Sequence, residues 1–232
     1  MWQALRTQLL PQGIEIVTVA LDTGGADAAR QWIEAAKPEH PSLIDAAHVL
    51  DELLGFVNVP NAIWIDENGM IVRPSEPAWP GSTPVLDLLK DENFFNLPPA
   101  QLVVREQIAG MHINPQQYLD MILDWAANGS ASKFVMTPSQ VIERSQPRSL
   151  DDSSAVAHFE LAQHLHRSGK AEAAIAHFRE AHRLQPNNWT YKRQAWNLEA
   201  GDPLTGSRSF EGNWLDDVKA IGAENYYPPI MA

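Results

Sequence analysis

The sequence contains no cysteine, and this absence removes several kinds of chemistry at once. Without a thiol the chain can form no disulfide, hold no zinc ion through sulfur, and attack neither a disulfide nor a peroxide with a thiolate. The chain therefore cannot perform thiol-disulfide chemistry by itself.

Long apolar runs and clusters of positive charge are also missing. No stretch approaches the roughly 18–20 apolar residues that cross a bilayer, and the first residues lack the basic and apolar regions of a secretory signal. The formal net charge is −12, and the longest basic run is the pair Lys192 and Arg193, which is too little to neutralise phosphates. We therefore expect a cytoplasmic protein with no membrane segment and no nucleic-acid partner; a signal lost from the amino terminus is the alternative.

What remains is typical of a folded, water-soluble chain. Of the 232 residues 44% are hydrophobic and 20% charged, which suits a globular protein of one large or two modest units. Shifts in composition predict four segments. They are an α/β domain over residues 1–95, a helical connector and linker over 96–150, a helical hairpin with a covering helix over 151–200, and a Gly/Pro/aromatic tail over 201–232.

The first segment alternates between strand and helix patterns. Residues 14–21 are rich in β-branched side chains, as in an interior strand covered on both faces. Two amphipathic helices follow, with these residues on their apolar faces: Ala29, Trp32, Ile33 and Ala36 in the first, and Val49, Leu50, Leu53 and Leu54 in the second. An Asn68-Gly69 turn between residues 62–65 and 70–72 then predicts a β hairpin. This order predicts an α/β layer architecture, with the strand over residues 14–21 beside residues 62–65.

The rest of the sequence reads mainly as helix. Four prolines over residues 73–84 predict a linker or surface strap, and apolar spacing predicts helices over 85–89, 101–109 and 116–127. Residues 128–152 are rich in Ser, Gly, Pro and charge, which predicts a hinge. Trp214, Tyr226 and Tyr227 of the tail are expected to be packed rather than exposed.

Residues 155–186 follow the pattern of one tetratricopeptide-like (TPR) helical hairpin. Small and large residues recur at the spacing of that 34-residue repeat, with Ala162, Ala174 and Ala181 where two helices approach closely. One hairpin cannot bury its apolar face alone, so a helix over 188–198 with Trp189 and Trp196 is expected to cover it. A protein or peptide partner would bind its groove through the exposed side chains of Gln163, His166 and Arg179.

Residues 13–72 resemble the redoxins, thioredoxin-like proteins that include alkyl hydroperoxide reductase-type peroxiredoxins and TlpA-like thiol-disulfide oxidoreductases. The matching stretches are residues 14–22, 41–45 and, above all, Val59-Pro60 with the hairpin that follows it. The resemblance implies a partial thioredoxin-like fold, antioxidant or oxidoreductase activity, and a cis proline at Pro60. Val59 and Pro60 would then face the redox centre and its substrate.

The departure from that family matters more than the match. Residues 1–10 resemble the far end of the redoxin active-site helix, while the preceding strand and cysteine-bearing turn are absent. No catalytic residue can therefore be carried over from the family, and no cofactor is expected. The chain is either a shortened form of a redox protein, whose missing turn carries cysteine or a selenocysteine encoded by a recoded stop, or a noncatalytic thioredoxin-like plus TPR interaction module.

Other chemistry finds little support in the sequence. Five histidines, at 158, 164, 166, 177 and 182, lack the i,i+4 spacing of a metal pair on one helix, so no metal site is expected. Asp45, Asp51 and Glu52 are expected to form a solvated helix start rather than an acid-base pair. Trp189 and Trp196 share a helix face and are expected to seal the hairpin rather than bind a ligand.

Overall fold

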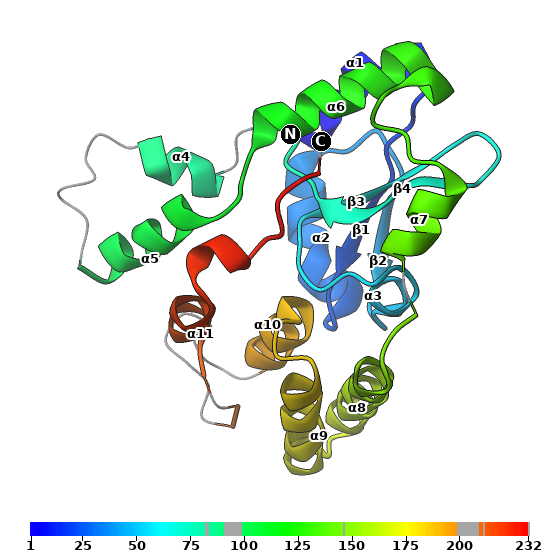
Figure 1. Cartoon of the computed structure of the whole chain (residues 1–232). Coiled ribbons are helices and arrows are strands. Elements are labelled where there is room, and N and C mark those ends of the chain that lie inside the picture. The colour runs from blue at the N-terminus through cyan, green and yellow to red at the C-terminus, as the bar shows by residue number, and fades with distance from the viewer. Residues whose placement is uncertain (82–83, 91–98, 146, 199–208, 211, 232) are drawn as a thin grey trace.

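The protein has a mixed α/β fold that is mainly helical and contains two small β sheets (Figure 1). The computed structural model describes residues 1–81, 84–90, 99–145, 147–198, 209–210 and 212–231. The helices are α1 Trp2–Leu9, α2 Gly25–Ala36, α3 Val49–Leu54, α4 Pro84–Lys90, α5 Pro99–Gly110, α6 Pro115–Asn128, α7 Pro138–Arg144, α8 Leu150–Arg167, α9 Ala171–Leu184, α10 Trp189–Asn197 and α11 Trp214–Ile221. The strands are β1 Thr18–Leu21, β2 Ser42–Asp45, β3 Asn61–Ile65 and β4 Ile71–Pro77. Among the described residues no helix is both long and apolar enough to cross a membrane.

Within the described residues each sheet has two strands. β1 pairs in parallel with β2, and β3 pairs antiparallel with β4, so the predicted hairpin at Asn68-Gly69 is confirmed. The Asp66 side chain fixes the turn by accepting from the backbone N–H groups of Asn68 at 2.9 Å and Met70 at 2.8 Å. The predicted pairing of residues 14–21 with residues 62–65 is wrong, because β1 pairs with β2 instead.

The predicted burial of the first strand and helices is also wrong. β1 begins only at Thr18, and Val17 is 53% exposed. On α2 only Ala29 is buried, while Trp32 is 72% exposed; Leu53 on α3 is exposed as well. For Val17 the physical reason is that no described strand covers the second edge of β1, beside which this residue lies.

The first part of the stretch over residues 73–84, up to Pro77, is a strand rather than a linker. Pro74 and Pro77 lie within β4, where an edge position tolerates the missing N–H. The Arg73 side chain is buried and donates to Glu76, to the Phe134 carbonyl oxygen at 2.9 Å and to the Met231 carbonyl oxygen. This one guanidinium therefore ties β4 to two distant segments of the chain.

The region predicted as a hinge contains a capped helix. In α7, the Thr137 hydroxyl accepts from the Gln140 N–H while the Gln140 side chain accepts from the Thr137 N–H, which is a capping box. The hinge prediction missed this short helix because its polar side chains resemble a loop in composition. The helices predicted over 85–89, 101–109 and 116–127 correspond to α4, α5 and α6.

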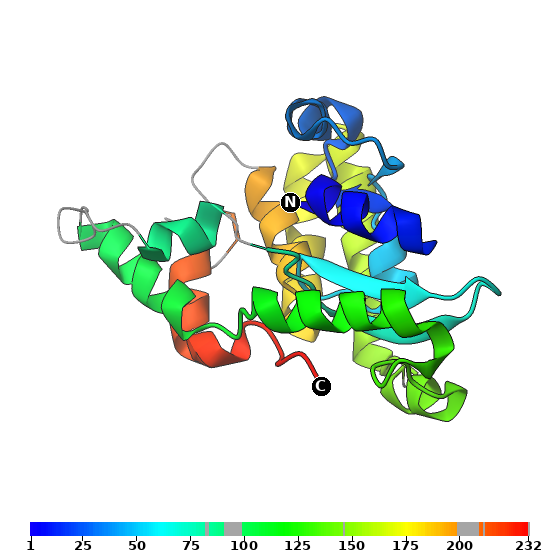
Figure 2. The ribbon, with the colours of Figure 1, turned by 90° about the horizontal axis from the view of Figure 1, so that it is seen from above.

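Two apolar clusters hold these elements together. Seen from above, the ribbons of α1 and α6 run along the β3–β4 hairpin (Figure 2). The smaller cluster packs α1 and α6 against β3, with Trp64 stacked on Trp125 at 4.9 Å between ring centroids. The larger one joins the α8–α9 hairpin to α10, α11 and the last residues of the chain. Its members include Trp79 and Ile108, so segments far apart in sequence share one core.

The small residues of the hairpin pack as their spacing predicts, whereas Leu161, which the repeat pattern also included, is 42% exposed. Ala162, Ala174 and Ala181 are all fully buried between α8 and α9, and Gly169 turns the chain with φ of 74°. The expected covering helix exists as α10, whose Trp189 and Trp196 are buried. The predicted packing of Trp214, Tyr226 and Tyr227 is confirmed, since all three are buried.

Ala174→Leu tests this packing. The larger side chain should overpack the interface between α8 and α9 and lower the free energy of unfolding by about 1–3 kcal/mol. Ala173→Leu, at the exposed neighbouring position, should change it by less than about 0.5 kcal/mol. Urea unfolding of both variants checks the assignment, and equal losses would contradict it.

His182 should make the stability of the protein depend on pH. Burial, assisted by the charge of Lys192, lowers the pKa of this imidazole from 6.5 to about 4, and its Nε2 atom has no hydrogen-bond partner among the described residues. The unfolded chain binds the proton of this imidazole more tightly than the folded chain does. The contribution of His182 to the stability of the folded protein is therefore fully present above pH 6.5 and is lost as the pH falls toward 4. We expect a loss of about 2 kcal/mol in unfolding free energy between pH 7.5 and pH 5, absent in His182→Leu. His164→Leu, at an exposed position on α8, should keep the wild-type slope.

Candidate functional site

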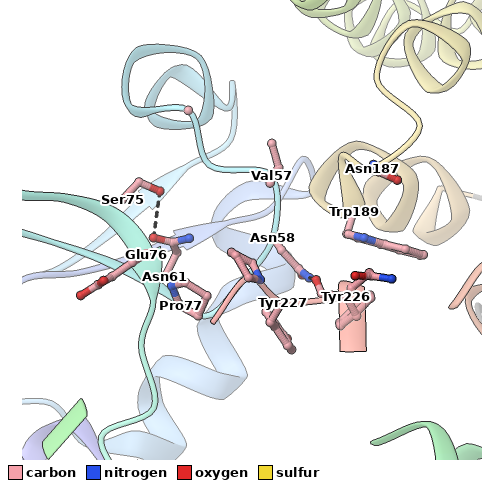
Figure 3. A pocket seen from close by; sticks show the side chains of 13 residues that line it. Val57, Asn58, Asn61, Ser75, Glu76, Pro77, Asn187, Trp189, Tyr226 and Tyr227 are labelled. Atoms are coloured by element: carbon pink, nitrogen blue, oxygen red, sulfur yellow. Dashed lines mark hydrogen bonds between the residues drawn. The ribbon is translucent and has the colours of Figure 1, made fainter. Parts of the chain in front are cut away.

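A concave region of the described protein lies beside the loop that precedes β3, here called the Pro60 loop (residues 57–61). A cavity of about 170 Å³ opens between this loop, the end of β4, the start of α10 and the carboxy-terminal segment. Its lining includes Asn61, Ser75, Asn187, Trp189 and Tyr226 (Figure 3). The region therefore combines residues from four parts of the sequence.

The Pro60 loop is held by hydrogen bonds from the helical part of the chain. The peptide bond between Val59 and Pro60 is cis, as the redoxin resemblance implies. The Val57 carbonyl oxygen accepts from the N–H groups of Trp189 at 2.7 Å and Thr190 at 3.3 Å, both in the first turn of α10. The first N–H groups of a helix have no acceptor within the helix. The Val57 carbonyl oxygen supplies an acceptor for two of them at the start of α10.

Asn58 and Tyr227 form hydrogen bonds with the two backbone polar groups of Val59, its N–H and its carbonyl oxygen. The buried Asn58 side chain accepts from the Val59 N–H at 2.9 Å and donates to the Tyr226 carbonyl oxygen at 3.1 Å. The Tyr227 hydroxyl donates to the Val59 carbonyl oxygen at 2.8 Å. Both polar groups of Val59 are therefore satisfied within the chain.

The site is almost free of uncompensated charge. Glu76 pairs with Arg73, and Figure 3 shows its side chain pointing away from Tyr226. Burial raises the pKa of Glu76 and of Tyr227, so Tyr227 stays a neutral hydrogen-bond donor at ordinary pH. Amides, hydroxyls and aromatic rings suit binding of a polar, uncharged group such as peptide backbone, whereas no nucleophile with a nearby base lies in the loop.

Gln194 of α10 makes a second contact beside this site. Its Oε1 atom accepts from the N–H and the hydroxyl of Thr23, both at 2.9 Å, and its Nε2 atom donates to the Leu21 carbonyl oxygen at 3.2 Å. The carboxyl end of β1 is thus capped by the helical part of the chain. Sequence reasoning missed this role because a glutamine in a helix carries no signal for a partner 171 residues away.

A buried histidine–aspartate pair lies between α3 and α8. The Nδ1 atom of His48 is 2.7 Å from Oδ2 of Asp51, and the imidazole meets the Phe159 ring edge-on at 5.3 Å. Asp51 was predicted to be solvated, but it is buried, and burial raises its pKa. The pair has no neighbouring nucleophile among its described contacts, and the ring contact with Phe159 joins the start of α3 to the hairpin.

The structure does not assemble the predicted groove of Gln163, His166 and Arg179. Gln163 is 2% exposed, and its Oε1 atom accepts from Arg167 at 3.2 Å. His166 is partly buried, and Arg179 is exposed and donates to the Ser209 carbonyl oxygen at 2.8 Å. The prediction that Gln163 is an exposed contact is therefore wrong, because α8 turns this side chain inward.

Comparisons of the chain with protein-family models, with curated proteins and with solved structures found no match. The Pro60 loop is consequently described by its own geometry. That geometry shows a site whose only lining carboxylate among the described residues, Glu76, is paired with Arg73, and whose loop is closed by Tyr227 and by the start of α10.

Tyr227→Phe tests the closure of this loop. Removing the hydroxyl leaves the Val59 carbonyl without its donor, which should lower the free energy of unfolding by about 1–2 kcal/mol. Tyr118→Phe is the control, because its hydroxyl makes only a 3.5 Å contact with Trp64 and should cost under about 0.5 kcal/mol. Hydrogen exchange at residues 57–61 should accelerate in Tyr227→Phe alone; equal exchange in both variants would contradict the contact.

Proposed function

We propose that this chain is part of a redoxin of the thiol-disulfide oxidoreductase or peroxiredoxin type, with the redox-active segment outside the given residues. The fold proposed is thioredoxin-like over residues 1–95, joined to a TPR-like hairpin. The main observation that supports this proposal is the division of the β structure into two sheets. Each sheet has an edge that lacks a strand among the described residues. A single additional strand between β1 and β3 would join them into one sheet of five.

The side chains at these edges support the insertion of a strand. Val17, directly before β1, is 53% exposed, and Ile65, at the end of β3, is 48% exposed. Both are apolar residues of the kind that sheets normally bury. Ile14 and Ile16 before β1 pack on the same cluster as Ala62 and Trp64 of β3, so the two sheets lie against one set of helices.

The backbone of β1 supports the same proposal. The Thr18 N–H donates to the Pro41 carbonyl oxygen on the β2 side at 3.0 Å. Because successive residues of a strand point to opposite edges, the N–H groups of Val19 and Leu21 face away from β2. Gln194 occupies only the Leu21 carbonyl at the end of this edge. The rest of the edge is left for a partner strand, which would relieve the cost of unpaired backbone groups.

The redoxin resemblance gives this missing strand a function. In that family a central strand leads into the turn that carries the redox cysteine and then into the active-site helix. α1 packs on β3 through Leu5 and Leu9, which suits the far end of such a helix. Val59 and Pro60 would then lie beside the redox centre.

The alternative is a noncatalytic interaction module. It is favoured by the closure of the Pro60 loop, since Asn58 and Tyr227 already occupy the Val59 backbone that a redoxin substrate would approach. In this case the α/β part is a platform, and the TPR-like hairpin or the cavity beside Trp189 binds a protein or peptide.

The two functions make different predictions for the coding DNA and for the protein. The chain itself should show neither dithiol-dependent insulin reduction nor peroxide turnover, because it has no thiolate. For the redoxin, an in-frame strand followed by a cysteine codon, or by a recoded stop, should lie upstream of the Met1 codon. Protein extended by that segment should turn over peroxide or a disulfide. An upstream region with neither codon would reject the redoxin in favour of the interaction module.

Amide hydrogen exchange tests the open edge separately. In the chain alone the Val19 amide should exchange much faster than the Thr18 and Ala20 amides, which face β2. In the extended protein Val19 should become protected, whereas Thr18 and Ala20 should change little. A protected Val19 amide in the chain alone would contradict the proposed strand position.

A further inference from the structure

Two histidines face each other across the α8–α9 hairpin, far from the Pro60 loop in sequence. His158 lies on α8 and His177 on α9, and both are partly buried. Their Nδ1 atoms are 2.9 Å apart, with ring centroids at 5.1 Å and ring planes tilted by 32°. No other part of the proposed function uses this pair.

We propose that His158 and His177 form a two-histidine binding site for a divalent copper ion. Between two neutral rings this short Nδ1 to Nδ1 approach holds one shared hydrogen, and a metal ion bound to both nitrogens would replace it. Neutral imidazole is a common ligand of copper, nickel and zinc. The metal would lie to one side of the line between the two nitrogens, so each ring would turn about its side-chain bonds to direct its lone pair to the ion.

The distance between the nitrogens favours copper over zinc. With metal–nitrogen bonds of about 2.0–2.1 Å, nitrogens 2.9 Å apart subtend about 90° at the metal. This is the angle between neighbouring ligands in the tetragonal sites of Cu²⁺ and Ni²⁺. A tetrahedral zinc site needs a wider angle and hence nitrogens roughly 3.3–3.4 Å apart. Copper also stands highest in the affinity order of the divalent first-row metals.

The hairpin fixes the two rings in advance. His158 and His177 directly precede Phe159 and Phe178, whose rings meet in the core at 5.8 Å. The close packing at Ala162 and Ala174 sets the separation of the two helices. The ligands therefore lose little freedom on binding, which is the advantage of a site built on rigid elements.

The nearest carboxylate on α9 is already paired. Glu180 lies one turn after His177, and both of its oxygens accept from Arg183, at 2.8 and 2.6 Å. Among the described residues no group of three or more candidate ligands is assembled, so water would complete the coordination.

Copper titration of the metal-free full chain tests the site. We expect one Cu²⁺ per chain at micromolar concentration, electron paramagnetic resonance splitting from two equivalent nitrogens, and a higher thermal midpoint that EDTA reverses. Affinity should follow the order Cu²⁺, Ni²⁺, Zn²⁺ and fall on acidification, because the ligands must be deprotonated.

Variants separate this site from the other histidines. His158→Asn and His177→Asn should each weaken copper binding at least tenfold, whereas His164→Asn and His166→Asn, on the same hairpin, should leave it unchanged. Circular dichroism in EDTA identifies any variant that fails to fold; for such a position the two-nitrogen spectrum of the wild type decides. Three outcomes would overturn the proposal: undetectable copper binding, an unchanged copper affinity in folded His158→Asn and His177→Asn, or zinc binding tighter than copper. The pair would then hold a shared proton and no metal.

Discussion

The constraint on which the structure depends is that each sheet has only two strands in the part of the chain that the structure describes. A two-stranded sheet has too little apolar face to be stable alone, so both sheets rely on helices for their burial. β3 and β4 obtain it from α1 and α6 through the stacked Trp64 and Trp125. β1 and β2 obtain much less, which explains why Val17 and Trp32 remain exposed.

Hydrogen bonds from the helical half of the chain also hold the α/β half in place. The start of α10 donates to the Val57 carbonyl, Gln194 caps the end of β1, and Tyr227 closes the Pro60 loop. Each contact supplies a hydrogen-bond partner to a backbone group that would otherwise lack one. A few such contacts are therefore enough to join the two halves. The same contacts hold the start of α10 and the carboxy-terminal segment against the Pro60 loop, where the cavity opens.

The close packing of the α8–α9 hairpin brings together two residues that are distant in sequence. Its small residues bring α8 and α9 close together, and this closeness places His158 against His177. Sequence spacing along one helix could not reveal this pair, because the two imidazoles are 19 residues apart and meet only when the helices pack antiparallel. The buried His48 and Asp51 were missed for the same reason, since their environment comes from Phe159 on another helix.

The sequence by itself determined the local elements and the chemistry that is excluded. Periodicity located α2, α3, α5, α6 and the α8–α10 region, the Asn68-Gly69 turn marked the hairpin, and the lack of cysteine excluded thiol chemistry, because each of these depends on residues close in the chain or on composition alone. Only the tertiary structure decided the partner of β1, the strand character of the proline-rich β4, the burial of Gln163 and Asp51, and the meeting of Tyr227 with Val59. Those features depend on which distant segment supplies a hydrogen bond or an apolar surface, and no local pattern encodes the identity of that segment.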